Sequence, residues 1–214
     1  MAGRPAAGGG RWVEVDPGRL SRWLAGFEER HGAFVQTIQG YGVSLTASDG
    51  ALAELHSPPG MPPVTTVDEL VSQAQESRRL GLVLARRGAV AVGVADGERL
   101  VQSKVDSSYV QGRTAAGGWS QQRFARRRDN QAKAAAAGAA DIVARLLLPV
   151  LSDLDAVVAG GDRRAVDAVL DDPRLGPVAA RLVDPFLDVG EPKLAVLQEA
   201  ARRARAMRIM VHNG

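Results

Sequence analysis

Several residue types are scarce in this chain of 214 residues, and each scarcity excludes a class of chemistry. Cysteine is absent, which rules out disulfide bonds, thiolate metal sites and a cysteine nucleophile. Only three histidines occur, which leaves little room for a zinc site built from protein ligands alone; they are His31, His56 and His212. No metal and no cofactor are therefore expected.

Long hydrophobic runs are also missing. The longest, around residues 146–151, falls far short of the roughly 20 apolar residues that span a bilayer. Residues 1–10 are rich in Gly, Ala and Pro and contain no apolar segment, so they do not resemble a secretory signal. We expect a disordered tail over 1–10, a cytoplasmic protein and no membrane partner.

The remaining composition, 45% hydrophobic and 24% charged, is that of a globular protein. Period-2 alternation predicts strands, and apolar residues three and four apart predict helices. Strands are expected near 12–15, 33–55, 80–84, 90–94, 99–110, 155–158, 182–186 and 209–211; helices are expected at 17–31, 66–76, 121–148, 162–170 and 192–207. This mixture predicts one α/β (α+β) domain over 11–214, with a single mixed sheet flanked by helices.

The positive charge of the chain is concentrated in one segment. The net charge is only +3, from 27 basic and 24 acidic residues. Residues 113–133 nevertheless carry six basic residues and one acid, Asp129, for a net charge of +5, so the other 193 residues sum to −2. The six basic residues are Arg113, Arg123, Arg126, Arg127, Arg128 and Lys133.

Runs of charge are usually solvated helix faces, but three features of this one favour a phosphate ligand. It lacks the interleaved acids that normally balance a surface helix. It consists almost entirely of arginine, whose planar fork matches phosphate oxygens. It also follows a Gly-rich segment, 112–120, which predicts a flexible loop that brings backbone close to a ligand. These features predict an RNA-binding element.

The same residues carry a family resemblance. Residues 117–126, GGWSQQRFAR, resemble the Gly-Gly-Gln loop and following helix in the middle domain of eukaryotic and archaeal peptide-chain release factors. The chain is still more similar to the Vms-like release-factor family, whose members cleave peptidyl-tRNA on stalled large ribosomal subunits. Residues 156–161 and 183–190 also fit that family, and the resemblance runs from about Trp12 to the end. It implies a middle-domain-like fold with a catalytic loop leading into a long Arg-rich helix.

The resemblance implies the site residues too. In release factors the glutamine directly follows the two glycines, Gly117 and Gly118 here, but Trp119 occupies that position. Vms-like proteins place it later, as Gly-x-x-Gln, which assigns the catalytic role to Gln121, with Gln122 as second choice. The residues implied in RNA binding are Arg113, Trp119, Arg123, Arg126, Arg127, Arg128 and Lys133.

The implied reaction is hydrolysis of the peptidyl-tRNA ester. The chain has no room for a separate stop-codon-reading domain, so the activity would be codon-independent, as in ribosome rescue. The implied partners are large-subunit rRNA and peptidyl-tRNA, with the protein acting as a ribosome-associated monomer. Two alternatives stay open: a non-catalytic RNA- or ribosome-binding module using the same Arg-rich helix, and an interaction protein whose helix meets an acidic partner.

Other candidate sites are weaker. Ser120 lacks the final glycine of a nucleophile elbow, so a serine hydrolase is not expected. The three histidines show no useful spacing and are expected to be packing or surface residues. The pair Asp171-Asp172 before a proline is typical of a turn at a helix end rather than of a metal site.

Overall fold

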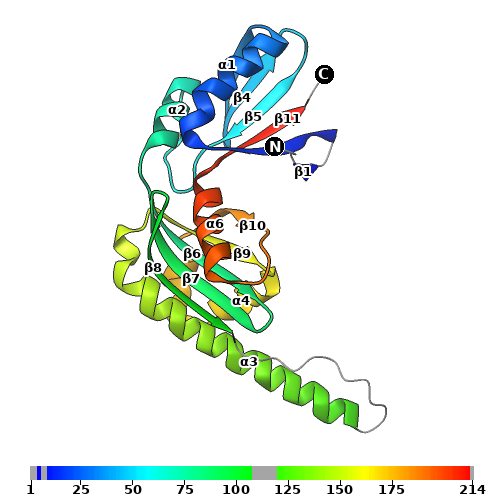
Figure 1. Cartoon of the computed structure of the whole chain (residues 1–214), viewed down its shortest axis with the longest axis vertical. Coiled ribbons are helices and arrows are strands. Elements are labelled where there is room, and N and C mark those ends of the chain that lie inside the picture. Colours follow the sequence, from blue (N-terminus) through cyan, green and yellow to red (C-terminus); the bar gives the residue numbers. More distant parts are fainter. Residues whose placement is uncertain (1–3, 6–8, 108–119, 213–214) are drawn as a thin grey trace. The chain divides into compact units, whose positions relative to one another are not determined.

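The computed structural model describes residues 4–5, 9–107 and 120–212. The chain forms two compact units, each with its own sheet (Figure 1). The first unit combines Met1–Ser77 with Arg205–Gly214, and the second is the continuous segment Arg78–Ala204. Each unit is described by itself below.

The first unit is an antiparallel sheet covered by two helices. Its strands, in spatial order, are β1 (Arg4–Pro5), β2 (Arg11–Val15), β11 (Met207–His212), β5 (Leu52–His56), β4 (Gly42–Ala47) and β3 (Phe34–Gln39). Its helices are η2 (Pro17–Arg19), α1 (Leu20–His31) and α2 (Val67–Gln75). Buried side chains from both helices and the sheet, such as Phe27, Leu70 and Leu45, form one core.

Local sequence signals set the ends of these helices. The Asp16 carboxylate accepts a hydrogen bond from the Gly18 N–H at 2.9 Å, and Pro17 follows as the first helical residue. Gly32, at φ 81°, ends α1 in a conformation that glycine adopts most easily. The Thr66 hydroxyl accepts from the Glu69 N–H at 3.1 Å and caps α2. These ends agree with the helices predicted at 17–31 and 66–76.

Two features of this unit differ from the sequence predictions. Arg4 and Pro5 pair with β2 as β1, so structure is present within the predicted disordered tail. The strand β11 was expected to extend the same sheet as the strands before it, but it pairs with β2 and β5 of the first unit. The chain therefore has two sheets where one was predicted, because strand pairing depends on contacts far apart in sequence.

The second unit is a mixed sheet with helices on both faces. Its strands, in spatial order, are β10 (Leu182–Leu187), β9 (Ala156–Gly161), β6 (Arg79–Arg86), β7 (Ala89–Asp96) and β8 (Arg99–Ser107). The β10–β9 and β9–β6 pairs are parallel and the others antiparallel. Its helices are α3 (Ser120–Leu147), η3 (Leu148–Asp153), α4 (Arg163–Leu170), η4 (Pro173–Leu175), α5 (Gly176–Ala179) and α6 (Leu194–Arg205). The predicted α/β class, with a mixed sheet flanked by helices, is confirmed.

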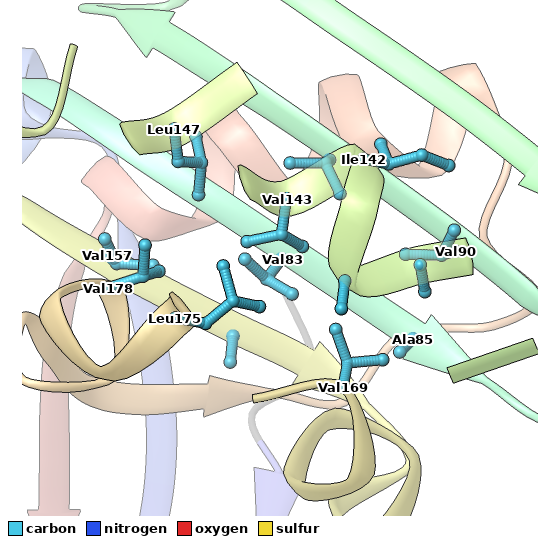
Figure 2. Packing of buried hydrophobic residues seen from close by; sticks show 14 of the residues in the cluster. Val83, Ala85, Val90, Ile142, Val143, Leu147, Val157, Val169, Leu175 and Val178 are labelled. Carbon is cyan, nitrogen blue, oxygen red and sulfur yellow. The ribbon is translucent and has the colours of Figure 1, made fainter. Parts of the chain in front are cut away.

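The central strands β6, β7 and β9 are buried on both faces, which explains their nearly continuous apolar sequences, whereas the edge strand β8 is mostly exposed. On one face Val83, Val143 and Val169 join β6, α3 and α4 in a single cluster (Figure 2). On the other face Leu82 and Leu197 belong to a second cluster, which joins the sheet to α6. The second unit is thus a three-layer arrangement with α3 and α4 on one side and α6 on the other.

The segment 130–153 is long and apolar enough to cross a membrane, judged by length and composition only. Its apolarity also has a local explanation, because Ile142, Val143 and Leu147 are buried in the core of the second unit.

The expectation of no membrane partner stays a prediction. So does the single domain over 11–214, because that depends on whether the two units fold independently.

Candidate functional site

The helix α3 joins the core of the second unit to the predicted catalytic segment. Its C-terminal part contributes Ala139, Val143 and Leu147 to the core. Its N-terminal part extends beyond the sheet of that unit (Figure 1). At about 1.5 Å of rise per residue, Gln121 lies about 21 Å along the helix axis from Ala135. The helix therefore presents its first turns well away from the surface on which it packs.

The predicted site residues divide into two groups. The backbone of α3 carries Gln121, Gln122, Arg123, Arg126, Arg127 and Arg128 within its first three turns, and Lys133 follows as an exposed residue. The second group lies outside the described residues and consists of Arg113, Gly117, Gly118 and Trp119. The structure thus gathers both candidate glutamines and four arginines on one helical segment.

The position of Gln121 and Gln122 at the start of α3 has a chemical consequence. The first four N–H groups of an α-helix have no acceptor within the helix, and the helix begins at Ser120. These N–H groups and the positive end of the helix dipole favour negative charge nearby. The backbone at the start of α3, which carries Gln121 and Gln122, therefore favours a negatively charged group nearby.

An ion-pair network fixes α3 against the turn after α4. The Arg174 guanidinium lies 2.7 Å from Asp141 of α3 and 2.7 Å from Asp172. The Arg174 side chain and backbone N–H both donate to Asp172 and lower the pKa of that carboxyl to about 2, while the pKa of Arg174 is raised. Asp172 and Arg174 are thus both charged at neutral pH. Asp172 caps η4, so the prediction of a turn here is confirmed.

A cavity of about 410 Å³ lies beside the packed part of α3. Its apolar walls include Ala132, Ala135 and Ala136 of α3 and Ala165 of α4, whose short side chains leave the space open. Its charged lining residues are Arg86, Arg87, Asp106, Asp162 and Arg164, all exposed. Sequence analysis did not single out this cavity; the adjacent Arg86 and Arg87 were the available signal for its charged rim.

The start of α4 holds one side of this cavity in place. The Asp162 carboxylate accepts from the Ala165 N–H at 3.1 Å, and the Asp162 N–H donates to the Ala85 carbonyl at 2.8 Å. Gly161 precedes it at φ 104°, where a Cβ would lie 2.2 Å from the Ala85 oxygen. Only glycine fits this close approach between β9 and β6.

The described lining of the cavity includes guanidinium and carboxylate groups but no imidazole or hydroxyl. Across the described residues no group of three or more His, Cys, Asp or Glu side chains could hold a metal ion. His31 bonds to Asp49 at 2.8 Å, and His56 stacks on Tyr41, so both have packing roles as expected.

Three solved structures resemble the chain at low identity. The archaeal translation termination factor aRF1 has 17% identity and a TM-score of 0.45, and the match covers 90% of this chain and 63% of that one. The Vms1 mitochondrial localization core has 12% identity and a TM-score of 0.44, with coverages of 88% and 82%. A structure titled only as an archaeal protein has 18% identity, a TM-score of 0.40 and coverages of 73% and 48%. The chain thus spans about half of the last of these proteins.

Among curated proteins no match was found. The family model described as Actinobacteria/chloroflexi VLRF1 release factor matches residues 78–210, and it begins at the first residue of the second unit. Because this match spans more than half of the chain, the chain belongs to the Actinobacteria/chloroflexi VLRF1 release-factor family, and the resemblance noted at residues 117–126 is confirmed.

Proposed function

We propose that this protein hydrolyses the ester bond of peptidyl-tRNA on stalled ribosomes or large subunits, independently of the codon. Gln121 is the residue proposed to position the attacking water, with Gln122 as second choice. The observation that carries the proposal is the place of both glutamines in the first turn of an Arg-rich helix, in a member of a release-factor family.

Family membership supports a role in translation and association with ribosomes. The net charge of +5 over residues 113–133 supports RNA as the surface that the helix meets. Four arginines within the first turns of α3 could each hold a phosphate by two parallel hydrogen bonds. The length of the helix beyond the core supports reach into a confined RNA site.

The proposed reaction needs few protein groups. Water attacks the ester carbonyl, the bond to the ribose oxygen breaks, and the products are a peptide carboxylate, a tRNA hydroxyl and a proton. A glutamine amide orients water without titrating, and backbone N–H groups at the helix start stabilise the oxyanion. Ribose and rRNA hydroxyls close to the ester would supply the remaining proton transfers.

The partners under this proposal are large-subunit rRNA and peptidyl-tRNA, with the protein acting as a monomer in the cytoplasm. Arg113, Trp119, Arg123, Arg126, Arg127, Arg128 and Lys133 are the proposed RNA contacts, and Gly117 and Gly118 are proposed to let the backbone approach the ester.

The test is peptide release from purified large subunits that carry peptidyl-tRNA. Gln121→Ala is expected to slow release on the order of 10²–10³-fold, the usual effect of removing one positioned donor. Gln131→Ala is the matched control, because it makes the same change ten residues further along α3 and should leave release unchanged.

Two results would contradict the assignment. Undiminished release by both Gln121→Ala and Gln122→Ala would remove the glutamines from the mechanism. Binding of the wild-type protein to the subunits without any release would instead favour the non-catalytic ribosome-binding module.

A further inference from the structure

The first unit contains a groove that the proposed release chemistry does not use. It has a volume of about 580 Å³ and lies between α1 and the strands β2 and β11. Its floor includes Val13, Val211, Trp23 and Phe27. The family match begins at residue 78, so β2 and α1 lie outside the matched segment. The groove therefore calls for an explanation separate from the one given for α3.

Four arginines line this groove, and all four are exposed: Arg11, Arg19, Arg22 and Arg30. Three of them follow one face of α1, because positions 19, 22 and 30 fall within about a quarter turn of each other at 100° per residue. Within the described part of the chain, none of the four guanidinium groups has an ion-pair partner. The lining also includes the carboxylates of Glu14 and Asp16, so four positive and two negative charges give the groove a net charge of +2, which favours an anionic ligand.

The groove also offers a flat aromatic surface. Trp23 is half-buried and stacks on the fully buried Phe27, with ring centroids 5.5 Å apart and an interplanar angle of 12°. Phe27 packs in the core and thus holds the Trp23 ring in place. Gly26 lies between Arg22 and Arg30 on the same helix face, and a Cβ there would lie 3.2 Å from a guanidinium nitrogen of Arg30. Glycine at this position therefore leaves room for the Arg30 side chain to lie along the groove.

We propose that this groove binds a nucleotide of single-stranded RNA, with the base against Trp23 and the flanking phosphates on Arg19, Arg22 and Arg30. Stacking on an aromatic ring supplies affinity without sequence preference, and arginines follow the backbone. An apolar floor beneath a cationic rim matches a nucleotide, which has a planar apolar base attached to an anionic backbone. An acidic peptide would use the rim but not the stacked rings. The proposal does not depend on release activity.

The experiment measures binding of a labelled single-stranded ribo-oligonucleotide to the full chain at several salt concentrations. All proteins carry one background in which every RNA contact proposed for α3 and the segment before it is replaced: Trp119→Phe, and alanine at Arg113, Arg123, Arg126, Arg127, Arg128 and Lys133. A negative result for RNA binding in the groove can then be distinguished from a negative result for the proposed release mechanism. Loss of two phosphate contacts in Arg22→Ala/Arg30→Ala should reduce the slope of log K against log salt by about 1.4, at about 0.7 per contact with a single strand.

The matched control is Arg99→Ala/Arg145→Ala, which removes the same charge from two exposed arginines of the second unit. It should leave the slope unchanged. Quenching of tryptophan fluorescence by the oligonucleotide should disappear in Trp23→Phe. Adenosine monophosphate is added as a competitor, to distinguish a free nucleotide from a strand as the ligand. If the ligand is a strand, adenosine monophosphate should displace the labelled oligonucleotide only weakly.

Three results would overturn the proposal. The first is an equal loss of slope in the control pair, which would indicate nonspecific charge. The second is quenching that survives in Trp23→Phe, which would place the base elsewhere. The third is full competition by a poly-glutamate peptide of equal charge, which would identify an acidic protein segment as the ligand.

Discussion

At the scale of single residues, Gly161 shows how one position determines the geometry beside α3. Its φ of 104° lies in a region that side chains rarely adopt, and a Cβ there would lie 2.2 Å from the Ala85 oxygen. The next residue, Asp162, donates its N–H to that same carbonyl and caps α4. A change at Gly161 would therefore disturb the β9–β6 pairing and the start of α4 together.

Gly161→Ala is expected to lower the free energy of unfolding by at least about 1–3 kcal/mol, the usual cost of a strained backbone conformation. Urea unfolding followed by circular dichroism measures this loss. Gly176→Ala is the control, because that glycine has no heavy atom within 4 Å of a built Cβ and an ordinary φ of −46°. An equal loss in both variants would contradict the argument.

Residue-level features that depend on near neighbours could be predicted from the sequence. Asp16, Thr66 and Asp162 cap helices close to the starts that were predicted, because the capping side chain and its N–H partner are only two or three residues apart. Thr66 and Glu69 have the spacing of a capping box, but the return contact differs. Glu69 accepts from the Thr65 N–H at 2.7 Å, so the return contact is made one residue earlier than in the usual capping box.

At the scale of elements, α3 combines a charged start with an alanine-rich middle. Alanine has the highest helix propensity, so the middle of the helix forms without requiring side-chain burial. Gly138 interrupts this alanine run, is exposed, and has no heavy atom within 4 Å of a built Cβ. Nothing in the described structure requires glycine at this position.

Gly138→Ala is therefore expected to raise the free energy of unfolding by about 1 kcal/mol. Ala137→Gly makes the reverse change at the neighbouring exposed position and should lower it by a similar amount. Helical circular dichroism at 222 nm during thermal unfolding tests both variants. A destabilised Gly138→Ala variant would show that this glycine has a packing or functional role.

The existence of most elements could be predicted, but their association could not. Alternating apolar residues identified β6, β7 and β9, and helical spacing identified α1, α3 and α6. Nothing in the local pattern of residues 207–212 indicates whether they pair with β10 or with β2. That choice is made by contacts across the whole sequence, so the second sheet was missed.

At the scale of the whole molecule, the charge pattern that indicates a candidate site can be identified from the sequence more easily than the arrangement of the elements. The excess positive charge appears on counting residues, and five of the six basic residues of segment 113–133 lie on α3. The candidate site on this segment stays a prediction. The cavity lined by Arg86, Arg87 and Arg164 needs three elements to come together, and the groove on α1 needs two strands from opposite ends of the chain. Such sites are invisible to local patterns.

The two units also differ in how the chain builds them, and this difference leads to a prediction. The second unit is a continuous segment that contains both faces of its sheet and the helices that cover them. The first unit is discontinuous, because β11 lies between β2 and β5 in its sheet. Removal of β11 would leave β2 and β5 without the strand that lies between them and pairs with both. It would also remove Met207 and Ile209 from the core.

A fragment of residues 78–204 is therefore expected to fold alone, whereas a fragment of residues 1–77 is not. Joining 1–77 to 205–214 through a short Gly/Ser linker should restore folding, and the same fusion with Ile209→Asp is the control that should not. Dispersion of amide proton signals in NMR spectra distinguishes these states. A folded 1–77 fragment would show that β11 is dispensable. An unfolded 78–204 fragment would instead support the prediction of one domain over 11–214. The second unit would then require the rest of the chain in order to fold, although helices cover both faces of its sheet.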